Sequence, residues 1–204
     1  MVAIIDYDAG NIKSVQKACE ALGAETIVTD QALRIREADA VILPGVGAFG
    51  KAMSNLRERG LDTAITETIV SGKPFFGICL GLQLLFEESE ESPGEQGLGI
   101  LKGRIVRIPE KAGLRVPHIG WNSLTFPRAG RLFEGIREGA FVYFVHSFYC
   151  QAEEAVVRAQ TDYGVRMDVS VEQGNLFATQ FHPEKSGQTG LAILKNFLDM
   201  AKLA

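Results

Sequence analysis

The sequence is poor in cysteine and has no excess of positive charge. Its 204 residues include 3 cysteines, which are too few and odd in number for a disulfide framework, and no CxxC pair suggests structural zinc. Lysine and arginine total 21 against 25 acidic residues, giving a net charge of −4, and they form no basic stripe. We therefore expect no nucleic-acid partner.

Long hydrophobic runs and cofactor motifs are also missing. The longest strongly apolar run, Phe75 to Phe86, has about 12 residues, whereas a membrane helix needs about 20. The first residues, MVAIIDYD, lack the positive and apolar regions of a signal peptide, so we expect a cytoplasmic protein with no membrane partner. There is no metal-ligand cluster and no Gly-Lys-Ser/Thr phosphate loop, so we expect no metal and no cofactor.

The composition is that of a folded globular chain. It is 46% hydrophobic and 23% charged, which is too apolar for a disordered protein. At roughly 150 residues per domain, the length predicts a single domain over 1–204.

Strands and helices alternate in the first half of the chain. Apolar, β-branched runs predict strands at 2–6, 26–29, 40–43 and 75–78. Helical spacing predicts helices over 12–22, 48–59 and 62–70, and the pattern of Leu80, Leu84 and Leu85 predicts another. Apolar strands separated by helices indicate an α/β fold: a doubly wound, mostly parallel sheet flanked by helices.

The second half of the chain has a different pattern of predicted elements. Short β-like runs at 104–108, 141–145, 155–159, 168–171 and 176–180 predict an antiparallel extension of the sheet, and an amphipathic helix ends the chain around Leu191 to Ala201. The acidic run Glu87 to Glu91 is typical of a solvated helix end and loop.

Cys79 occupies a position that suits a nucleophile. It lies in Gly77-Ile-Cys79-Leu-Gly81, where a buried strand turns directly into a helix, as in the elbow written G-x-S-x-G. The flanking glycines permit a strained turn, and a helix N-terminus favours the reactive thiolate. The same pattern also fits a small buried hydrophobic residue.

A cysteine nucleophile needs a base, and His182 is the best placed of the three histidines. Pro183 favours extended backbone at His182, and residues two apart in an extended segment project to the same side, so His182 and Glu184 can face one partner together. The pair has the form of a base with an orienting carboxylate.

Acyl transfer also needs hydrogen-bond donors for the developing oxyanion. The backbone N–H of Leu80 is one candidate, and the turn Pro44-Gly-Val-Gly47 at the end of a neighbouring strand can supply another. In open α/β sheets, sites gather at these strand ends.

These motifs together resemble those of the class I, triad-type glutamine amidotransferases, over essentially the whole chain. Within that family the chain is most similar to the glutaminase subunits of imidazole glycerol phosphate synthases. The segments that carry the resemblance are Pro44-Gly-Val-Gly-Ala-Phe49, Gly77-Ile-Cys-Leu-Gly-Leu-Gln83, Pro117-His-Ile-Gly-Trp-Asn122, Tyr143-Phe-Val-His-Ser-Phe148 and Phe181-His-Pro-Glu-Lys-Ser186.

The resemblance implies a two-step covalent hydrolysis of glutamine. Cys79 would attack the side-chain amide, His182 would shuttle the proton and Glu184 would orient the imidazole, with water then releasing glutamate from the thioester. The oxyanion site would use the Leu80 N–H and a peptide around Val46. The residues implied to hold glutamine are Gly47, Gln83, His146, Ser147 and Phe148.

The resemblance also implies a heterodimeric partner, a (β/α)₈ cyclase that uses the ammonia to make imidazole glycerol phosphate in histidine biosynthesis. The residues implied to face this partner or the ammonia route are Asn11, Trp121, Tyr143 and Lys185. From the residues alone, Asn11 also fits a helix cap, Tyr143 a strand core and Trp121 ordinary packing.

Other cysteines and histidines have plainer interpretations, and other functions stay open. We expect His118, after Pro117, to lie in a loop with a structural or interface role, and Cys19 and Cys150 to be inert. The alternatives are a glutaminase subunit of another amidotransferase, a free-standing cysteine hydrolase, and a flavodoxin-like binding module in which Cys79 is only core.

Overall fold

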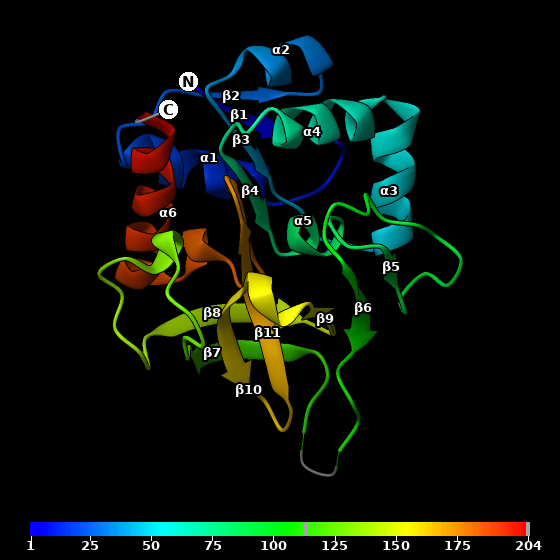
Figure 1. The fold of residues 1–204 in the computed structure, drawn as a ribbon, viewed down its shortest axis with the longest axis vertical. Coiled ribbons are helices and arrows are strands. Elements are labelled where there is room, and N and C mark those ends of the chain that lie inside the picture. The colour runs from blue at the N-terminus through cyan, green and yellow to red at the C-terminus, as the bar shows by residue number, and fades with distance from the viewer. Residues whose placement is uncertain (112–113, 203–204) are drawn as a thin grey trace.

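The structure is a computed structural model that describes residues 1–111 and 114–202 (Figure 1). Its largest sheet contains β1 (Val2–Ile5), β2 (Thr26–Thr29), β3 (Ala40–Leu43), β4 (Phe75–Ile78), β5 (Glu88–Ser89), β6 (Gly103–Arg107), β9 (Phe148–Ala152), β10 (Val157–Asp162), β11 (Arg166–Gln173) and β12 (Leu176–Thr179). A separate hairpin pairs β7 (His118–Ser123) with β8 (Phe141–His146).

Helices connect and cover these strands. They are α1 (Ile12–Ala21), α2 (Ala32–Glu37), α3 (Phe49–Glu58), α4 (Leu61–Val70), α5 (Leu80–Gln83) and α6 (Gly187–Lys202), with short 3₁₀ turns η1 (Arg131–Phe133), η2 (Glu154–Val156) and η3 (Pro183–Lys185). In the described parts of the chain, no helix combines the length and the apolar character needed to cross a membrane.

The sheet has a parallel half and a largely antiparallel half. The strand order is β2-β1-β3-β4-β12-β11-β9-β6-β5, with β10 beside β11. All pairs from β2 to β12 are parallel, and β12 then pairs antiparallel with β11. This confirms the predicted fold class, but it corrects the placement of the run 176–180. That run forms β12, which joins the parallel half to the antiparallel half.

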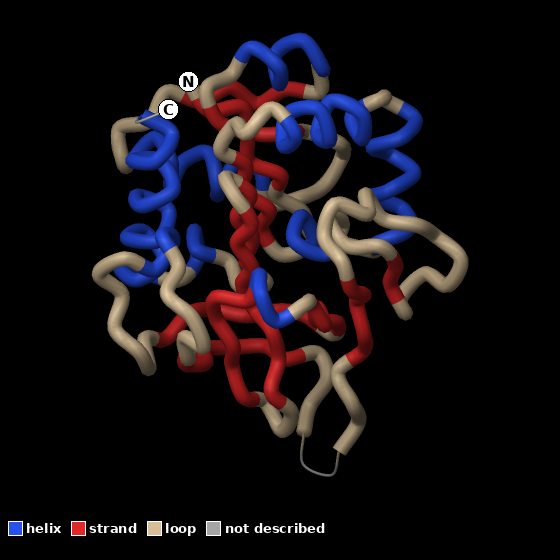
Figure 2. Tube along the Cα trace, viewed as in Figure 1, coloured by secondary structure: helices blue, strands red, loops and turns tan. Residues whose placement is uncertain are grey.

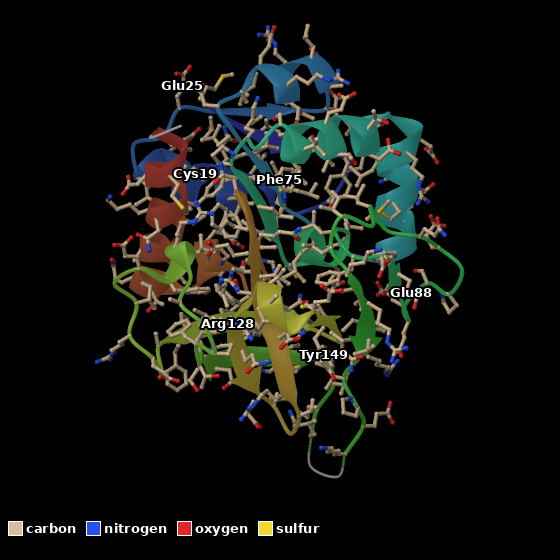
Figure 3. The ribbon with its side chains drawn as sticks, viewed as in Figure 1. Cys19, Glu25, Phe75, Glu88, Arg128 and Tyr149 are labelled. Atoms are coloured by element: carbon tan, nitrogen blue, oxygen red, sulfur yellow. The ribbon has the colours of Figure 1, made fainter. Side chains whose placement is uncertain are left out.

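Two hydrophobic cores lie on opposite faces of the parallel strands, because successive strand residues project to opposite sides. Ile4 and Ile42 pack toward α1 and α6, whereas Ile5 and Leu43 pack toward α2, α3 and α4. Figure 1 shows these two groups of helices on either side of the sheet. Phe75, labelled in Figure 3, lies fully buried in the second core.

Helices gather around the parallel half, and strands and loops make up most of the antiparallel half (Figure 2). Several local predictions need correction. The helix α2 has no counterpart among the predicted elements, and α5 is a single turn that ends at Gln83, short of Leu84 and Leu85. His118 begins strand β7 and does not lie in a loop.

Candidate active site

Cys79 lies at the sharp turn between β4 and α5. Its backbone has φ 55° and ψ −105°, a strained conformation for a residue with a side chain. A Cβ at Gly77 would meet the Gly81 carbonyl oxygen at 2.8 Å, and a Cβ at Gly81 would overlap the Leu43 carbonyl oxygen. The two flanking glycines are therefore required by space, which is the close backbone approach that the elbow pattern predicts.

His182 and Glu184 form a buried, hydrogen-bonded pair beside this turn. His182 Nδ1 lies 2.8 Å from Glu184 Oε1, and neither side chain is exposed. His182 has extended backbone, with φ −98° and ψ 97°, as Pro183 predicts, but Glu184 lies in the 3₁₀ turn η3 and not in an extended segment. Asn11 Nδ2 donates to the same carboxylate oxygen at 2.7 Å, which holds the carboxylate in place.

The charges around His182 favour its protonated form. Burial lowers the pKa of His182, but hydrogen bonds and charge from Cys79 and Glu184 outweigh burial and raise the pKa to about 9. Nδ1 is engaged by Glu184, whereas the buried Nε2 has no conventional hydrogen-bond partner within the described residues. The imidazole therefore has one nitrogen anchored and the other available on the side of Cys79.

A cavity of about 300 Å³ opens over Cys79. The residues that line it come from the 44–47 turn, the elbow, the acidic run and the end of the β7–β8 hairpin: Val46, Gly47, Cys79, Leu80, Gln83, Glu91, Pro117, Val145, His146, Ser147 and Phe148. Every residue predicted for the oxyanion site or for holding glutamine is in this set. The cavity lies at the carboxyl ends of β3 and β4, where α/β sheets place their sites.

One of the two predicted oxyanion donors, the Leu80 N–H, is engaged in a backbone hydrogen bond. The Leu80 N–H donates to the Gly45 carbonyl oxygen at 3.3 Å, so this peptide presents an acceptor, not a donor, to the elbow. The Val46 N–H belongs to the same peptide and points away from the Gly45 oxygen, because a trans peptide sets the two groups opposite each other. Gly47, at φ 113°, has a backbone that side-chain-bearing residues rarely adopt.

Sequence reasoning missed three residues at this site. Gln180 Nε2 lies 3.6 Å from Cys79 Sγ, and its Oε1 accepts from Gln83 Nε2 at 3.0 Å. Glu91 lines the cavity while its Oε2 accepts the Phe49 N–H at 2.7 Å, which corrects the expectation of a merely solvated loop. Tyr7 is buried and donates to the Pro44 carbonyl at 2.8 Å, so it supports the 44–47 turn from below.

The residues predicted to face a partner do not all lie in one environment. Trp121 is 54% exposed, so ordinary core packing does not describe it, and Lys185 is also exposed. Tyr143 is half-buried opposite Trp121 on the hairpin, with ring centroids 6.1 Å apart. Asn11 begins α1 without a side-chain capping bond and instead contacts Glu184.

Two further histidines are buried together near the cavity. His118 Nδ1 lies 3.0 Å from His146 Nε2, and His146 Nδ1 lies 2.9 Å from the Phe148 carbonyl oxygen. Burial lowers the pKa of His118 to about 4 and that of His146 to about 3. Across residues 1–111 and 114–202, no group of three or more His, Cys, Asp or Glu side chains is arranged to hold a metal ion.

Comparison with known proteins agrees with this geometry. The family model described as glutamine amidotransferase class-I matches residues 3–201. The chain belongs to the class-I glutamine amidotransferase family.

Relatives define the branch of the amidotransferases. The chain is 53% identical over 204 residues to the imidazole glycerol phosphate synthase subunit HisH of Moorella thermoacetica, covering 100% of this chain and 96% of that protein. It is 50% identical over 202 residues to the subunit HisH of Methanothermobacter thermautotrophicus, covering 99% and 100%. Both alignments cover at least 96% of each protein, so the similarity includes the segments that line the cavity.

Solved structures agree with the amidotransferase fold. A crystal structure of a glutamine amidotransferase superposes with a TM-score of 0.78 at 23% identity, covering 99% of this chain and 100% of that one. The structure of PurLQS from Thermotoga maritima gives 0.76 at 21% identity, covering 98% and 97%. The predictions of a glutamine amidotransferase, of its fold class and of the branch are confirmed; the roles of individual residues stay predictions.

Proposed function

We propose that this chain is the glutaminase subunit of an imidazole glycerol phosphate synthase, with Cys79 as nucleophile and His182 and Glu184 as its supporting pair. The observation that carries the proposal is the strained elbow at Cys79, which opens into a cavity beside a fully buried His182–Glu184 pair. Elbow, base and orienting carboxylate are the parts that acyl transfer to a thiol requires.

The reaction proceeds in two steps. Cys79 Sγ forms a bond to the side-chain carbonyl carbon of glutamine, and the carbon–nitrogen bond breaks as His182 Nε2 gives its proton to the departing ammonia. Water then attacks the glutamyl thioester while His182 takes a proton from it, the carbon–sulfur bond breaks, and glutamate leaves with Cys79 restored. Glu184 stabilises the imidazolium in both steps, and Asn11 fixes that carboxylate.

Binding of glutamine uses the cavity walls. Gly47, Gln83, His146, Ser147 and Phe148 surround the space above Cys79, which suits a small polar amino acid. The amide that reacts would point toward Cys79, and the α-amino and α-carboxyl groups would point toward the open side of the cavity.

Activation turns the Gly45–Val46 peptide. In the structure, which we interpret as the resting state, the Gly45 carbonyl oxygen accepts the hydrogen bond of the Leu80 N–H. A rotation of this peptide frees that N–H and brings in the Val46 N–H, giving two donors to the oxyanion. The resting chain alone is therefore a slow glutaminase, which prevents waste of glutamine when no ammonia acceptor is bound.

The partner is a (β/α)₈ cyclase, and its docking face is the outer side of the β7–β8 hairpin. Ile119 and Phe141 are 60% and 56% exposed, and they share one face with Trp121 because alternate and cross-strand residues project together. Exposed aromatic clusters of this kind mark protein interfaces. The backbone of Tyr143 in this hairpin also makes hydrogen bonds to the His182 N–H and the Ser186 hydroxyl, so the proposed docking surface is directly connected to the triad.

Asn11, which contacts Glu184, and the exposed Lys185 are proposed to border the ammonia route. We also place the chain in the cytoplasm, because its three cysteines are all free and buried, as suits a reducing compartment.

The test is glutamate release from glutamine by the chain alone, then with a purified cyclase subunit, and then with its nucleotide substrate or product added. A large increase that needs both additions supports glutaminase, partner and regulation together. Peptidase activity of the isolated chain without any response to glutamine would instead indicate a free-standing cysteine hydrolase. Activity with a different ammonia acceptor, found by pull-down, would indicate another amidotransferase.

A further inference from the structure

The His118–His146 pair lies outside the proposed triad. His146 lines the proposed glutamine pocket, whereas His118 has no role in the reaction proposed above. The two residues face each other across the β7–β8 hairpin, on the face opposite Trp121. They are 3% and 6% exposed, and their facing nitrogens are 3.0 Å apart. A buried polar pair of this kind needs a defined arrangement of protons, because an unmatched nitrogen there is costly.

The hydrogen-bond partners determine that arrangement. The Phe148 carbonyl oxygen can only accept, so His146 Nδ1 carries the proton and donates to it at 2.9 Å. His146 Nε2 is then an acceptor, and His118 Nδ1–H must be its donor. His118 Nε2 in turn accepts from Asn122 Nδ2 at 3.5 Å. Burial lowers the pKa of both residues, so both imidazoles are assigned as neutral Nδ1–H tautomers.

The chain of hydrogen bonds continues from this pair to the reactive sulfur. The Phe148 carbonyl also accepts from Gln83 Nε2 at 3.2 Å. Gln83 Nε2 donates to Gln180 Oε1 at 3.0 Å, and Gln180 Nε2 lies 3.6 Å from Cys79 Sγ. The histidine pair therefore anchors the Phe148 carbonyl. This carbonyl belongs to one wall of the cavity, and through Gln83 and Gln180 it is also linked to Cys79 Sγ.

Aromatic rings hold His118 in this orientation. Its ring stacks on Phe144 at 4.8 Å and on Tyr163 at 3.9 Å, with interplanar angles of 24° and 25°. The ring is stacked against these two aromatic rings while its edge makes the hydrogen bonds. A side chain with the same ring shape but no N–H would keep the packing and lose only the donor.

We propose that His118 is a positioning residue for the glutaminase reaction: its Nδ1–H fixes the tautomer and ring of His146, which holds the Phe148 carbonyl wall of the glutamine pocket. The kinetic part of this inference rests on the proposed function, because it assumes that the chain hydrolyses glutamine. The positioning itself is a property of the resting chain and can be measured without turnover.

The kinetic test compares three variants in the complex with the cyclase subunit and saturating nucleotide. His118→Phe keeps the stacked ring but leaves His146 Nε2 without a donor, and we expect the KM for glutamine to rise about tenfold with a smaller change in kcat. His118→Asn places an amide N–H near the position of Nδ1, and should restore KM to within about threefold of the wild type. Tyr163→Phe, which loses only its bond to the Arg115 carbonyl, is the matched control and should leave KM unchanged.

The direct test is ¹⁵N NMR of the wild-type chain labelled at histidine. The chain has 3 histidines, so the signals are few and each is assigned by its variant. We expect His118 and His146 each to show a protonated Nδ1 and an unprotonated Nε2 at pH 7. In His118→Phe, the His146 signals should shift toward a mixture of tautomers.

The outcomes are separable. An Nε2–H tautomer or an imidazolium at either residue overturns the proposal whatever the kinetics, and this wild-type spectrum needs no variant to fold. An unchanged KM in His118→Phe, or a loss in His118→Asn as large as in His118→Phe, also overturns it. If the wild-type complex releases no glutamate, the proposed function fails, and the NMR spectrum still decides whether the pair is arranged as described.

Discussion

Two groups of buried histidines lie close to the same cavity and have opposite protonation behaviour. His182 is buried beside the sulfur of Cys79 and the carboxylate of Glu184, and its pKa is raised to about 9. His118 and His146 are buried beside each other and a carbonyl group, and their pKa values fall to about 4 and 3. Burial disfavours the imidazolium in both places, so the neighbouring charges decide the sign of the shift.

The opposite pKa shifts suit two different tasks, proton transfer and the positioning of neighbouring groups. A base that must accept and return protons near neutral pH needs groups that stabilise its cation, and these groups are Cys79 and Glu184. A residue that must hold one hydrogen-bond pattern needs a fixed neutral tautomer, and a dry environment supplies it. The same side chain thus serves chemistry in one place and geometry in the other.

The largest expected effect comes from removing the nucleophile. We expect Cys79→Ala to abolish glutamine-dependent synthesis by the complex, by about 10⁴-fold or more, because no other group at the elbow can form the thioester. Added ammonium should still support synthesis through the partner. Cys150→Ala is the control, since this thiol is buried away from the cavity and burial raises its pKa.

Loss of both the glutamine and the ammonium routes in Cys79→Ala would mean that the variant damages folding or assembly. Full glutamine-dependent activity in this variant would contradict the role of Cys79 and favour a binding module.

A smaller effect is expected from neutralising the carboxylate that supports His182. Glu184→Gln should reduce glutamine-dependent turnover on the order of 10³-fold, because the imidazolium loses its buried counter-charge and its orientation. The pKa of His182, followed by NMR, should fall below 9 and so approach the behaviour of the other pair. Glu25→Gln, at the exposed position labelled in Figure 3, is the control and should change neither quantity.

A His182 pKa that stays near 9 in Glu184→Gln would show that Cys79 alone determines the charge of the histidine. The contrast between the two histidine groups would then rest on the sulfur and not on the carboxylate.

The smallest effect is on stability as a function of pH. The unfolded chain protonates its histidines near pH 6.5, before folded His118 and His146, so unfolding should become easier as pH falls from 6.5 toward 5. Folded His182 keeps its proton after the unfolded chain loses it, so stability should also fall as pH rises from 6.5 to 9. Each histidine contributes at most about 1.4 kcal/mol per pH unit.

Urea unfolding at pH 5, 6.5, 8 and 9 measures this directly, and the midpoint should be highest near pH 6.5. His118→Phe should roughly halve the acid slope and leave the alkaline slope unchanged. If the loss of stability between pH 6.5 and pH 5 is the same in His118→Phe and in the wild type, His118 has an ordinary pKa in the folded chain.

The elbow and the His182–Glu184 pair were predictable because their geometry is local. The two glycines around Cys79 lie within two residues of it, and their need follows from backbone crowding at one turn. Pro183 sets the backbone of His182, and its partner Glu184 is two residues away. A spacing of a few residues leaves little freedom, so the motif predicts the contact, although Glu184 reaches His182 from a 3₁₀ turn and not from the predicted extended segment.

Contacts between distant segments were not predictable in this way. Gln180 reaches Cys79 across 101 residues of sequence, and His118 meets His146 only because β7 and β8 pair in a particular register. The local pattern is also misleading at His118, because Pro117 before it predicts a loop, whereas His118 begins strand β7. Nothing in the local pattern of either residue indicates its partner.

By itself, the sequence determined the order of most strands and helices, the strained cysteine turn and the histidine–carboxylate pair, since all depend on hydrophobic periodicity and short-range sterics. The tertiary structure decided the rest: β12 as the junction of the sheet, the Gly45 carbonyl on the Leu80 N–H, and the opposite pKa shifts of the buried histidines. These depend on desolvation and on partners brought together by folding, because a pKa or a hydrogen bond is set by what surrounds a group in space.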